Sequence, residues 1–203
     1  MNLFEVNRRH LEQIFPRLKT EVFEEFQPTD ELLIEQNRSG EVSATLNGRW
    51  IHSKHNPYRE AERLIESAFK DKSSNHAVFL GFGLGYQIDE FFRRCPQGEA
   101  VIIERCPELF LKALTGRDFR TLFTHKISLL IGLAEEELPA ALAALIERNH
   151  TLIPLVPITQ SAPEYYSYAK SVIQNERSRK QVNSTTVKRF GRRWIRNLAR
   201  NIE

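Results

Sequence analysis

The sequence predicts an α/β fold in which a parallel sheet carries helices on both faces. Short, continuously apolar runs alternate with helix-like segments between residues 76 and 156. Such runs are typical of strands buried on both faces of a parallel sheet. A glycine-rich turn joins the first of these strands to its helix, as in Rossmann-like folds. A helix and a β-meander are predicted before this sheet, and further helices after it.

Composition limits the classes of protein to consider. The chain has 203 residues, of which 41% are hydrophobic and 27% are charged, as in soluble globular proteins. No apolar run approaches the ~18 residues of a membrane span, and the N-terminus lacks the apolar segment of a secretion signal. Two cysteines, Cys95 and Cys106, are too few for a disulfide framework or a thiolate metal site. We therefore expect a cytoplasmic protein with no membrane span and no metal.

The first predicted unit covers residues 1–54. Helical spacing of apolar residues begins at Leu3, and Pro16 is expected to break or kink that helix. Three β-prone runs follow between residues 31 and 53, separated by Ser39-Gly40 and Asn47-Gly48. Because Asn-Gly between two such runs favours a tight hairpin, we predict a three-stranded meander.

The second predicted unit, residues 55–160, is the Rossmann-like domain. Asn56 and Pro57 mark a helix start, since Asn can cap a helix and Pro fits its first position. The predicted strands are 76–81, 100–104, 127–132 and 151–156, and the helices between them are 86–95, 107–114 and 134–149.

The third predicted unit, residues 161–203, is a helical linker or docking segment. One helix is predicted over 163–181 and an amphipathic helix over 186–202. The apolar stripe of the latter is Val187, Phe190, Trp194, Ile195, Leu198 and Ile202. Charge also separates here: residues 177–203 hold nine basic residues and one acidic residue, whereas residues 1–176 hold 20 basic and 25 acidic residues. Such a helix could bind nucleic acid, an anionic membrane surface or a neighbouring domain, and we favour the domain.

The glycine-rich turn is the clearest candidate for chemistry. Gly81, Gly83 and Gly85 close a predicted strand and open a helix, where backbone N–H groups can face a nucleotide-type ligand. The G-x-G-x-G spacing is similar to the first motif of S-adenosylmethionine-dependent methyltransferases, whereas Tyr86 stands where a dinucleotide fingerprint has its third glycine.

An acidic residue completes this candidate site. Glu104 ends the next predicted strand, where Rossmann-type folds bind ribose hydroxyls. Phe79, however, stands where methyltransferases usually carry an acid. The predicted ligand-binding residues are therefore Gly81, Gly83, Gly85, Tyr86 and Glu104, and the alternative is that the glycines only allow a tight turn. The ligand would be of nucleotide type, with S-adenosylmethionine as one candidate.

Other polar residues give weaker functional signals. His52 and His55 are three residues apart, but no further His or Cys stands at a useful spacing, so we interpret both as ordinary loop histidines. No nucleophile elbow is present, and we assign no catalytic residue.

Four segments, taken together, resemble the N-terminal part of the Maf proteins, the motility-associated factors or flagellin glycosyltransferases. The matching residues are Ser53, Pro57, Glu60, Ala61, the Gly81–Tyr86 turn, Glu104, Phe190, Trp194, Asn197 and Asn201. They span nearly the whole chain.

The resemblance implies a function. Maf proteins transfer nonulosonic acids, such as pseudaminic or legionaminic acid, from a CMP-activated donor to Ser or Thr of flagellin in the cytoplasm. Their sialyltransferase-like catalytic domain follows the helix that ends this chain, and its glycine-rich loop has no counterpart in these 203 residues.

We therefore expect a non-catalytic, substrate-organising domain of the flagellin glycosylation machinery. Its expected partners are the following catalytic domain, bound through residues 186–202, flagellin and a second copy of the chain. The resemblance also makes a CMP-activated sugar a candidate ligand of the glycine-rich turn. One alternative is a small methyltransferase-like or nucleotide-binding protein. Another is a nucleic-acid-binding module, which we do not favour.

Overall fold

The computed structural model describes residues 2–38, 40–70, 74–146 and 149–200, with side chains as far as residue 181. Its elements, in chain order, are α1 (Leu3–Ile14), η1 (Lys19–Phe23), β1 (Leu32–Gln36), β2 (Val42–Leu46), β3 (Arg49–Trp50), α2 (Pro57–Phe69), β4 (His76–Leu80), α3 (Tyr86–Arg94), β5 (Glu99–Glu104), α4 (Pro107–Ala113), η2 (Leu122–Thr124), β6 (Lys126–Ile131), η3 (Glu135–Glu137), α5 (Leu138–Leu145), β7 (His150–Pro154), α6 (Val156–Ser161) and α7 (Pro163–Arg200).

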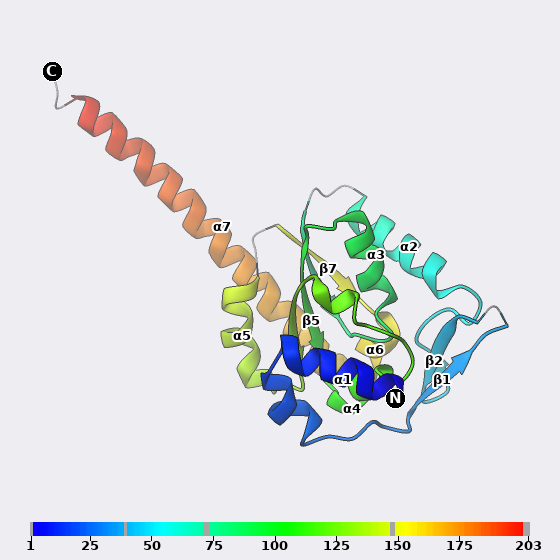
Figure 1. The fold of residues 1–203 in the computed structure, drawn as a ribbon. Coiled ribbons are helices and arrows are strands. Elements are labelled where there is room, and N and C mark those ends of the chain that lie inside the picture. Colours follow the sequence, from blue (N-terminus) through cyan, green and yellow to red (C-terminus); the bar gives the residue numbers. More distant parts are fainter. Residues whose placement is uncertain (1, 39, 71–73, 147–148, 201–203) are drawn as a thin grey trace.

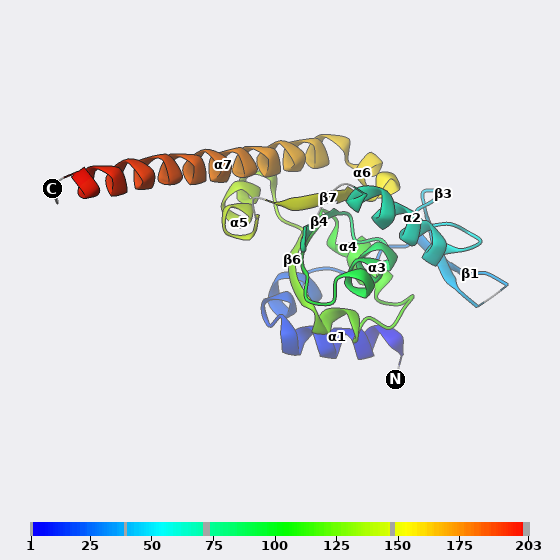
Figure 2. The same cartoon turned by 90° about the horizontal axis from the view of Figure 1, so that it is seen from above.

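The predicted parallel sheet is confirmed. Its strand order is β6-β5-β4-β7, and all three neighbouring pairs are parallel. Helices α2 and α3 lie on one side of the sheet, and α5 and α7 on the other (Figures 1 and 2). The chain steps outward from β4 through β5 to β6 and then returns to the far side of β4 as β7. The strand order therefore reverses between β4 and β7, which is where open α/β sheets bind ligands.

The predicted meander is also confirmed. Strands β1, β2 and β3 form an antiparallel sheet in that order. Asn47 and Gly48 both have positive φ angles, 50° and 76°, as the tight turn between β2 and β3 requires. Ser39, in the other predicted turn, lies outside the described residues.

The N-terminal helix ends before the helical spacing of apolar residues in the sequence does. Helix α1 stops at Ile14, just before Pro16, and a separate π-helical turn, η1, follows. Asn7 fixes α1 to the parallel-sheet unit, since its amide nitrogen donates to the carbonyl oxygens of Leu114 (2.8 Å) and Arg117 (2.7 Å), and its oxygen accepts from the N–H of Phe119 (2.9 Å).

The C-terminal region differs from the prediction of two helices over 163–181 and 186–202. One helix, α7, runs through 38 residues without a break. The first half of α7 packs against the body of the molecule through buried side chains, which are those of Tyr165, Tyr166, Ala169 and Ile173. The second half extends past α5, away from the rest of the molecule (Figures 1 and 2). The side chains of the predicted apolar stripe, and all of Ile202, lie outside the described part of the chain. Within the described residues, no helix has the length and hydrophobicity needed to cross a bilayer.

Candidate ligand site at the glycine loop

The glycine loop connects β4 to α3 at the carboxyl end of the sheet. Gly81, Gly83 and Gly85 all have positive φ angles, of 90°, 56° and 74°. This backbone region strongly favours glycine, so the three glycines are needed for the path of the loop itself. Gly85 also serves as the N-terminal cap residue of α3.

Side chains of the same molecule approach the loop closely. A Cβ atom on Gly81 would lie 2.8 Å from Ile158 of α6. A Cβ atom on Gly83 would lie 2.5 Å from Leu155 and 2.7 Å from the Nε2 atom of His52. The space that the glycines leave open is therefore filled by α6 and by the segment that follows the meander.

Two backbone N–H groups of the loop bind side chains of the chain itself. The N–H of Phe82 donates to Glu104 (3.0 Å), and the N–H of Leu84 donates to the Nε2 atom of His52 (2.9 Å). In a cofactor-binding loop, groups of this kind face the ligand. Here they join the loop to β5 and to residue 52.

Glu104 is enclosed at the end of β5, with 1% of its surface exposed. Besides the Phe82 N–H, its carboxyl group accepts hydrogen bonds from the N–H of Cys106 (3.1 Å) and the hydroxyl of Tyr166 (3.1 Å). Burial raises the pKa of Glu104, and these hydrogen bonds oppose that rise. The carboxyl group therefore links the glycine loop, β5 and α7.

Tyr86 connects the loop to the meander. Its hydroxyl donates to the carbonyl oxygen of Val42 in β2, and the Arg117 guanidinium lies 3.9 Å from the centre of its ring. Burial raises the pKa of the Tyr86 hydroxyl to about 12. The same guanidinium forms an ion pair with Asp89 (2.7 Å).

The structure thus gathers all five predicted ligand-binding residues around one loop, and the contacts described above engage each of them within the chain. None of the five lines the cavities described below. Binding of S-adenosylmethionine or a CMP-activated sugar by these residues stays a prediction, and a ligand on the loop would have to displace α6 or His52.

His52 is the residue of this region whose role the sequence did not reveal. Its Nε2 atom accepts a hydrogen bond, so a neutral ring carries its proton on Nδ1, which lies 3.7 Å from Glu60. Burial lowers the pKa of His52, with the ring 3% exposed. His55, by contrast, is exposed. Among the described side chains, no group of three or more His, Cys, Asp and Glu could hold a metal ion.

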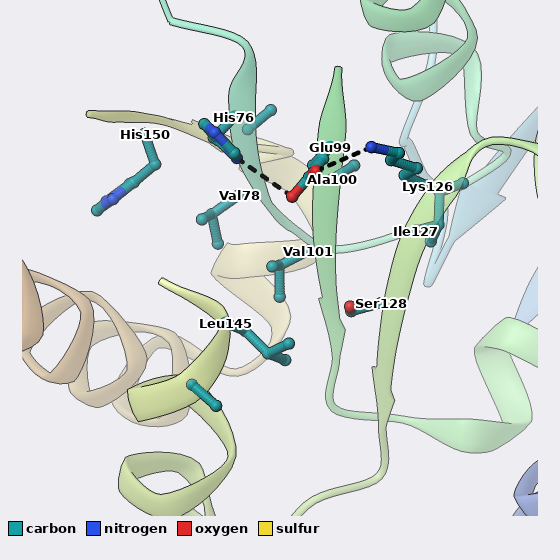
Figure 3. Close-up of a pocket in the computed structure, with 12 residues that line it drawn as sticks. His76, Val78, Glu99, Ala100, Val101, Lys126, Ile127, Ser128, Leu145 and His150 are labelled. Carbon is teal, nitrogen blue, oxygen red and sulfur yellow. Dashed lines mark hydrogen bonds and ion pairs between the residues drawn. The ribbon is translucent and has the colours of Figure 1, made fainter. Parts of the chain in front are cut away.

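The described residues line at least three cavities, none of which includes the five predicted ligand-binding residues. A groove of about 780 Å³ runs between η1, β6 and α5. A pocket of about 350 Å³ lies at the amino ends of the parallel strands (Figure 3), where Glu99 pairs with His76 (3.6 Å) and Lys126 (3.3 Å). A cavity of about 140 Å³ lies between α2, α3 and β7. Only this last cavity, of the three, adjoins the point where the strand order reverses.

Known proteins place this architecture in a family. Residues 44–179 match the family described as the Maf glycosyltransferase N-terminal domain. An uncharacterized protein of Treponema pallidum (strain Nichols) is 27% identical over 179 residues, which are 86% of this chain and 60% of that protein. The structure of a Maf glycosyltransferase from Magnetospirillum magneticum AMB-1 superimposes with a TM-score of 0.60 at 14% identity.

The extent of these matches is informative. The superposition covers 87% of this chain and 35% of the Magnetospirillum chain, so this chain spans about a third of that protein. At this level of identity the superposition establishes the shared fold. The family match contains the last three residues of β2, the parallel sheet and the first part of α7, which are elements that surround the glycine loop. The chain therefore belongs to the family of Maf glycosyltransferase N-terminal domains.

Proposed function

We propose that this chain is the organising, non-catalytic N-terminal domain of a Maf glycosyltransferase, and that it binds the catalytic part of the enzyme through the second half of α7. The enzyme as a whole would transfer a nonulosonic acid from a CMP-activated donor to Ser or Thr of flagellin in the cytoplasm. Family membership supports the glycosyltransferase context. The donor, the acceptor and the cellular location come from the sequence resemblance alone.

The observation that carries this proposal is the form of α7. Its first half is anchored by buried residues, including Tyr166, and by Lys180, whose ammonium group donates to the carbonyl oxygen of Ile146. Its second half leaves the body of the molecule (Figure 2), and the sequence gives that half both apolar and basic residues. A helix of this kind is suited to packing against another domain, since exposed apolar stripes commonly mark interaction sites.

The internal contacts of the glycine loop support an organising role. The buried carboxyl group of Glu104 and the buried imidazole of His52 both accept hydrogen bonds from backbone N–H groups of the loop. Groups engaged in this way stabilise the loop and are poorly placed to exchange protons with a substrate.

The test combines transfer and binding. The purified chain alone should not transfer sugar from a CMP-nonulosonic acid to flagellin, whereas a Maf catalytic domain added in trans should bind the chain saturably. Phe190→Ala with Trp194→Ala should weaken that binding at least tenfold. Gln174→Ala, which changes an exposed residue in the first half of α7, is the matched control. Sugar transfer by the chain alone would overturn the non-catalytic assignment.

A second candidate function, nucleotide binding at the glycine loop, is favoured by the strand order and by the position of the loop beside the reversal point. Calorimetric titration with S-adenosylmethionine, CMP and a CMP-nonulosonic acid distinguishes the cofactors. Saturable binding of S-adenosylmethionine would favour a methyltransferase-like protein. Binding of CMP or its sugar would instead give this domain a part in donor recognition.

A further inference from the structure

The 140 Å³ cavity beside the strand reversal has a wall that combines apolar side chains with a carboxylate and a buried amide. Residues after β3, residues of α2 and α3, and the segment from β7 into α6 all contribute to it. Glu60 and Val156 are exposed and place its mouth at the surface, whereas Ala61 and Gln87 are buried. The cavity is thus built by parts of the chain that are far apart in sequence.

Gln87, which lines this cavity, carries an unpaired acceptor. The side chain is 1% exposed, and its Nε2 atom donates to the carbonyl oxygens of Phe82 (3.0 Å) and Gly81 (3.4 Å). Because both of these partners are acceptors, they fix which end of the amide is nitrogen. The Oε1 atom has no hydrogen-bond partner. A buried carbonyl of this kind is normally completed by a donor from water or from a ligand.

The charge on the wall is negative. Glu60 and His52 are the two titratable residues that line the cavity. Partial burial would raise the pKa of Glu60, but the nearby His52 ring (3.7 Å) and a hydrogen bond from the Ser53 N–H (2.8 Å) lower it overall. His52 is neutral in this setting, and its two ring nitrogens face Leu84 and Glu60. The wall therefore presents acceptors and a carboxylate. The Gln87 amide nitrogen already donates to two carbonyl oxygens, and the Nδ1 side of His52 faces Glu60.

The remaining wall is apolar, with Ile51, Ala61, Leu64, Leu155, Val156 and Pro157. A water molecule occupies about 30 Å³ in the liquid, so the volume suits a group of about four or five non-hydrogen atoms. An anion would meet Glu60 and no cation on this wall. An aliphatic group that carries an ammonium or a hydroxyl would satisfy both the acceptors and the apolar surface.

We propose that this cavity is a binding site for a small aliphatic group bearing N–H or O–H donors, held by the Gln87 carbonyl and the Glu60 carboxylate, and that it excludes anions. The group can be a free small molecule or the end of a larger ligand that reaches in past Val156. The site is distinct from the five residues predicted to bind a nucleotide, and it does not depend on the glycosyltransferase role.

Three probes of four non-hydrogen atoms each test the proposal: ethanolamine, ethylene glycol and acetate. Titration of the ¹⁵N-labelled chain should shift the Gln87 side-chain amide and the Leu155 amide with ethanolamine or ethylene glycol. The expected Kd is on the order of millimolar for so small a ligand. The donor probe that binds more tightly identifies ammonium or hydroxyl as the group recognised, and acetate should produce no saturable shift.

A cavity-filling variant provides the structural control. Ala61→Leu should abolish the saturable shifts, whereas Ala68→Leu makes the same change elsewhere on α2, at a residue that does not line the cavity. Should Ala61→Leu fail to fold, Val156→Trp adds bulk at the mouth from an exposed position.

Three results would overturn the proposal. These are a cavity that binds neither donor probe, acetate binding as tight as ethanolamine binding, and donor-probe binding that persists in a folded Ala61→Leu variant. The first of these results would assign the cavity to water alone. Because the readout uses the chain by itself, it is unaffected by whether the chain binds a catalytic domain.

Discussion

Gly83 tolerates an added side chain less well than an ordinary turn glycine should. Its φ is +56°, and a Cβ atom would lie 2.5 Å from Leu155. We expect Gly83→Ala to lower the free energy of unfolding by about 2–4 kcal/mol, through overpacking added to left-handed strain. Urea denaturation measures this change.

Gly48→Ala is the matched control. Gly48 also has a positive φ, +76°, but no atom lies within 4 Å of an added Cβ. Its loss should be limited to strain, about 1–2 kcal/mol. Equal losses at the two positions would contradict the close packing of the glycine loop. Because of this packing, a bulky substitution at Gly83 would disturb folding, so a loss of ligand binding in such a variant would not by itself identify the loop as the binding site.

His52 makes stability depend on pH. Its folded pKa lies below the ordinary value of 6.5 because the ring is buried. As the pH falls below about 6.5, the unfolded chain takes up a proton that the folded chain does not bind, so the free energy of unfolding decreases with falling pH. The limiting slope is about 1.4 kcal/mol per pH unit.

Glu104 acts in the opposite direction. Its raised folded pKa means that, above about pH 4.5, the folded chain holds a proton that the unfolded chain has lost, and its contribution to stability decreases as the pH rises. Denaturation of His52→Gln beside the wild type separates the two effects, because glutamine can accept the Leu84 N–H but does not titrate. An unchanged slope between pH 5 and 6.5 would argue against a neutral His52.

At the scale of elements, Tyr166 joins α7 to the end of β5. Its hydroxyl donates to Glu104 and accepts from the N–H of Arg105 (3.3 Å). Tyr166→Phe should lower the free energy of unfolding by about 1–3 kcal/mol, since it removes a donor to a buried carboxyl group. Tyr168→Phe, two residues away at a side chain that is 38% exposed, should change it by less than about 0.5 kcal/mol. Thermal or urea denaturation of both variants decides the matter.

Elements with local signals were predictable. Asn47-Gly48 specifies a turn, Asn56-Pro57 starts α2, and the apolar runs after residue 76 specify buried parallel strands. Contacts between residues that are distant in sequence were not predictable. Nothing near His52 in the sequence indicates that it meets Leu84, and nothing near Glu104 indicates Tyr166. The glycine motif therefore predicted the loop and its backbone conformation, but not that the chain's own side chains fill the space beside it.

Helix α7 shows a different limit of the sequence. Residues 182–185, of which three are polar and have low helix propensity, separated the two predicted helices. They contain neither Gly nor Pro, however, so no residue forces the helix to stop. A single helix continues through them. Weak local preference is a poor predictor of an end when no residue interrupts the hydrogen bonding.

At the scale of the whole molecule, stability and partner binding should separate along α7. A chain that ends at residue 181 keeps the buried Tyr165, Tyr166 and Ile173. We expect its unfolding midpoint in urea to match that of the full chain and its affinity for a Maf catalytic domain to be lost. Size-exclusion chromatography of both chains also tests self-association through residues 186–202. A markedly destabilised short chain would place part of the core beyond residue 181.

Because α7 is one unbroken helix, it also fixes the direction in which residues of its second half lie relative to the sheet. Each residue of an α-helix turns the chain by about 100° and advances it by about 1.5 Å. Deleting one residue near position 181 would therefore rotate the backbone positions of residues 190 and 194 by about 100° about the helix axis, with almost no change in their distance from the sheet. Deleting seven residues would shorten that distance by about 10 Å but restore their orientation to within about 20°. If α7 joins this domain to a partner as proposed, a partner that depends on the orientation of these residues more than on their distance would tolerate the larger deletion better than the smaller one.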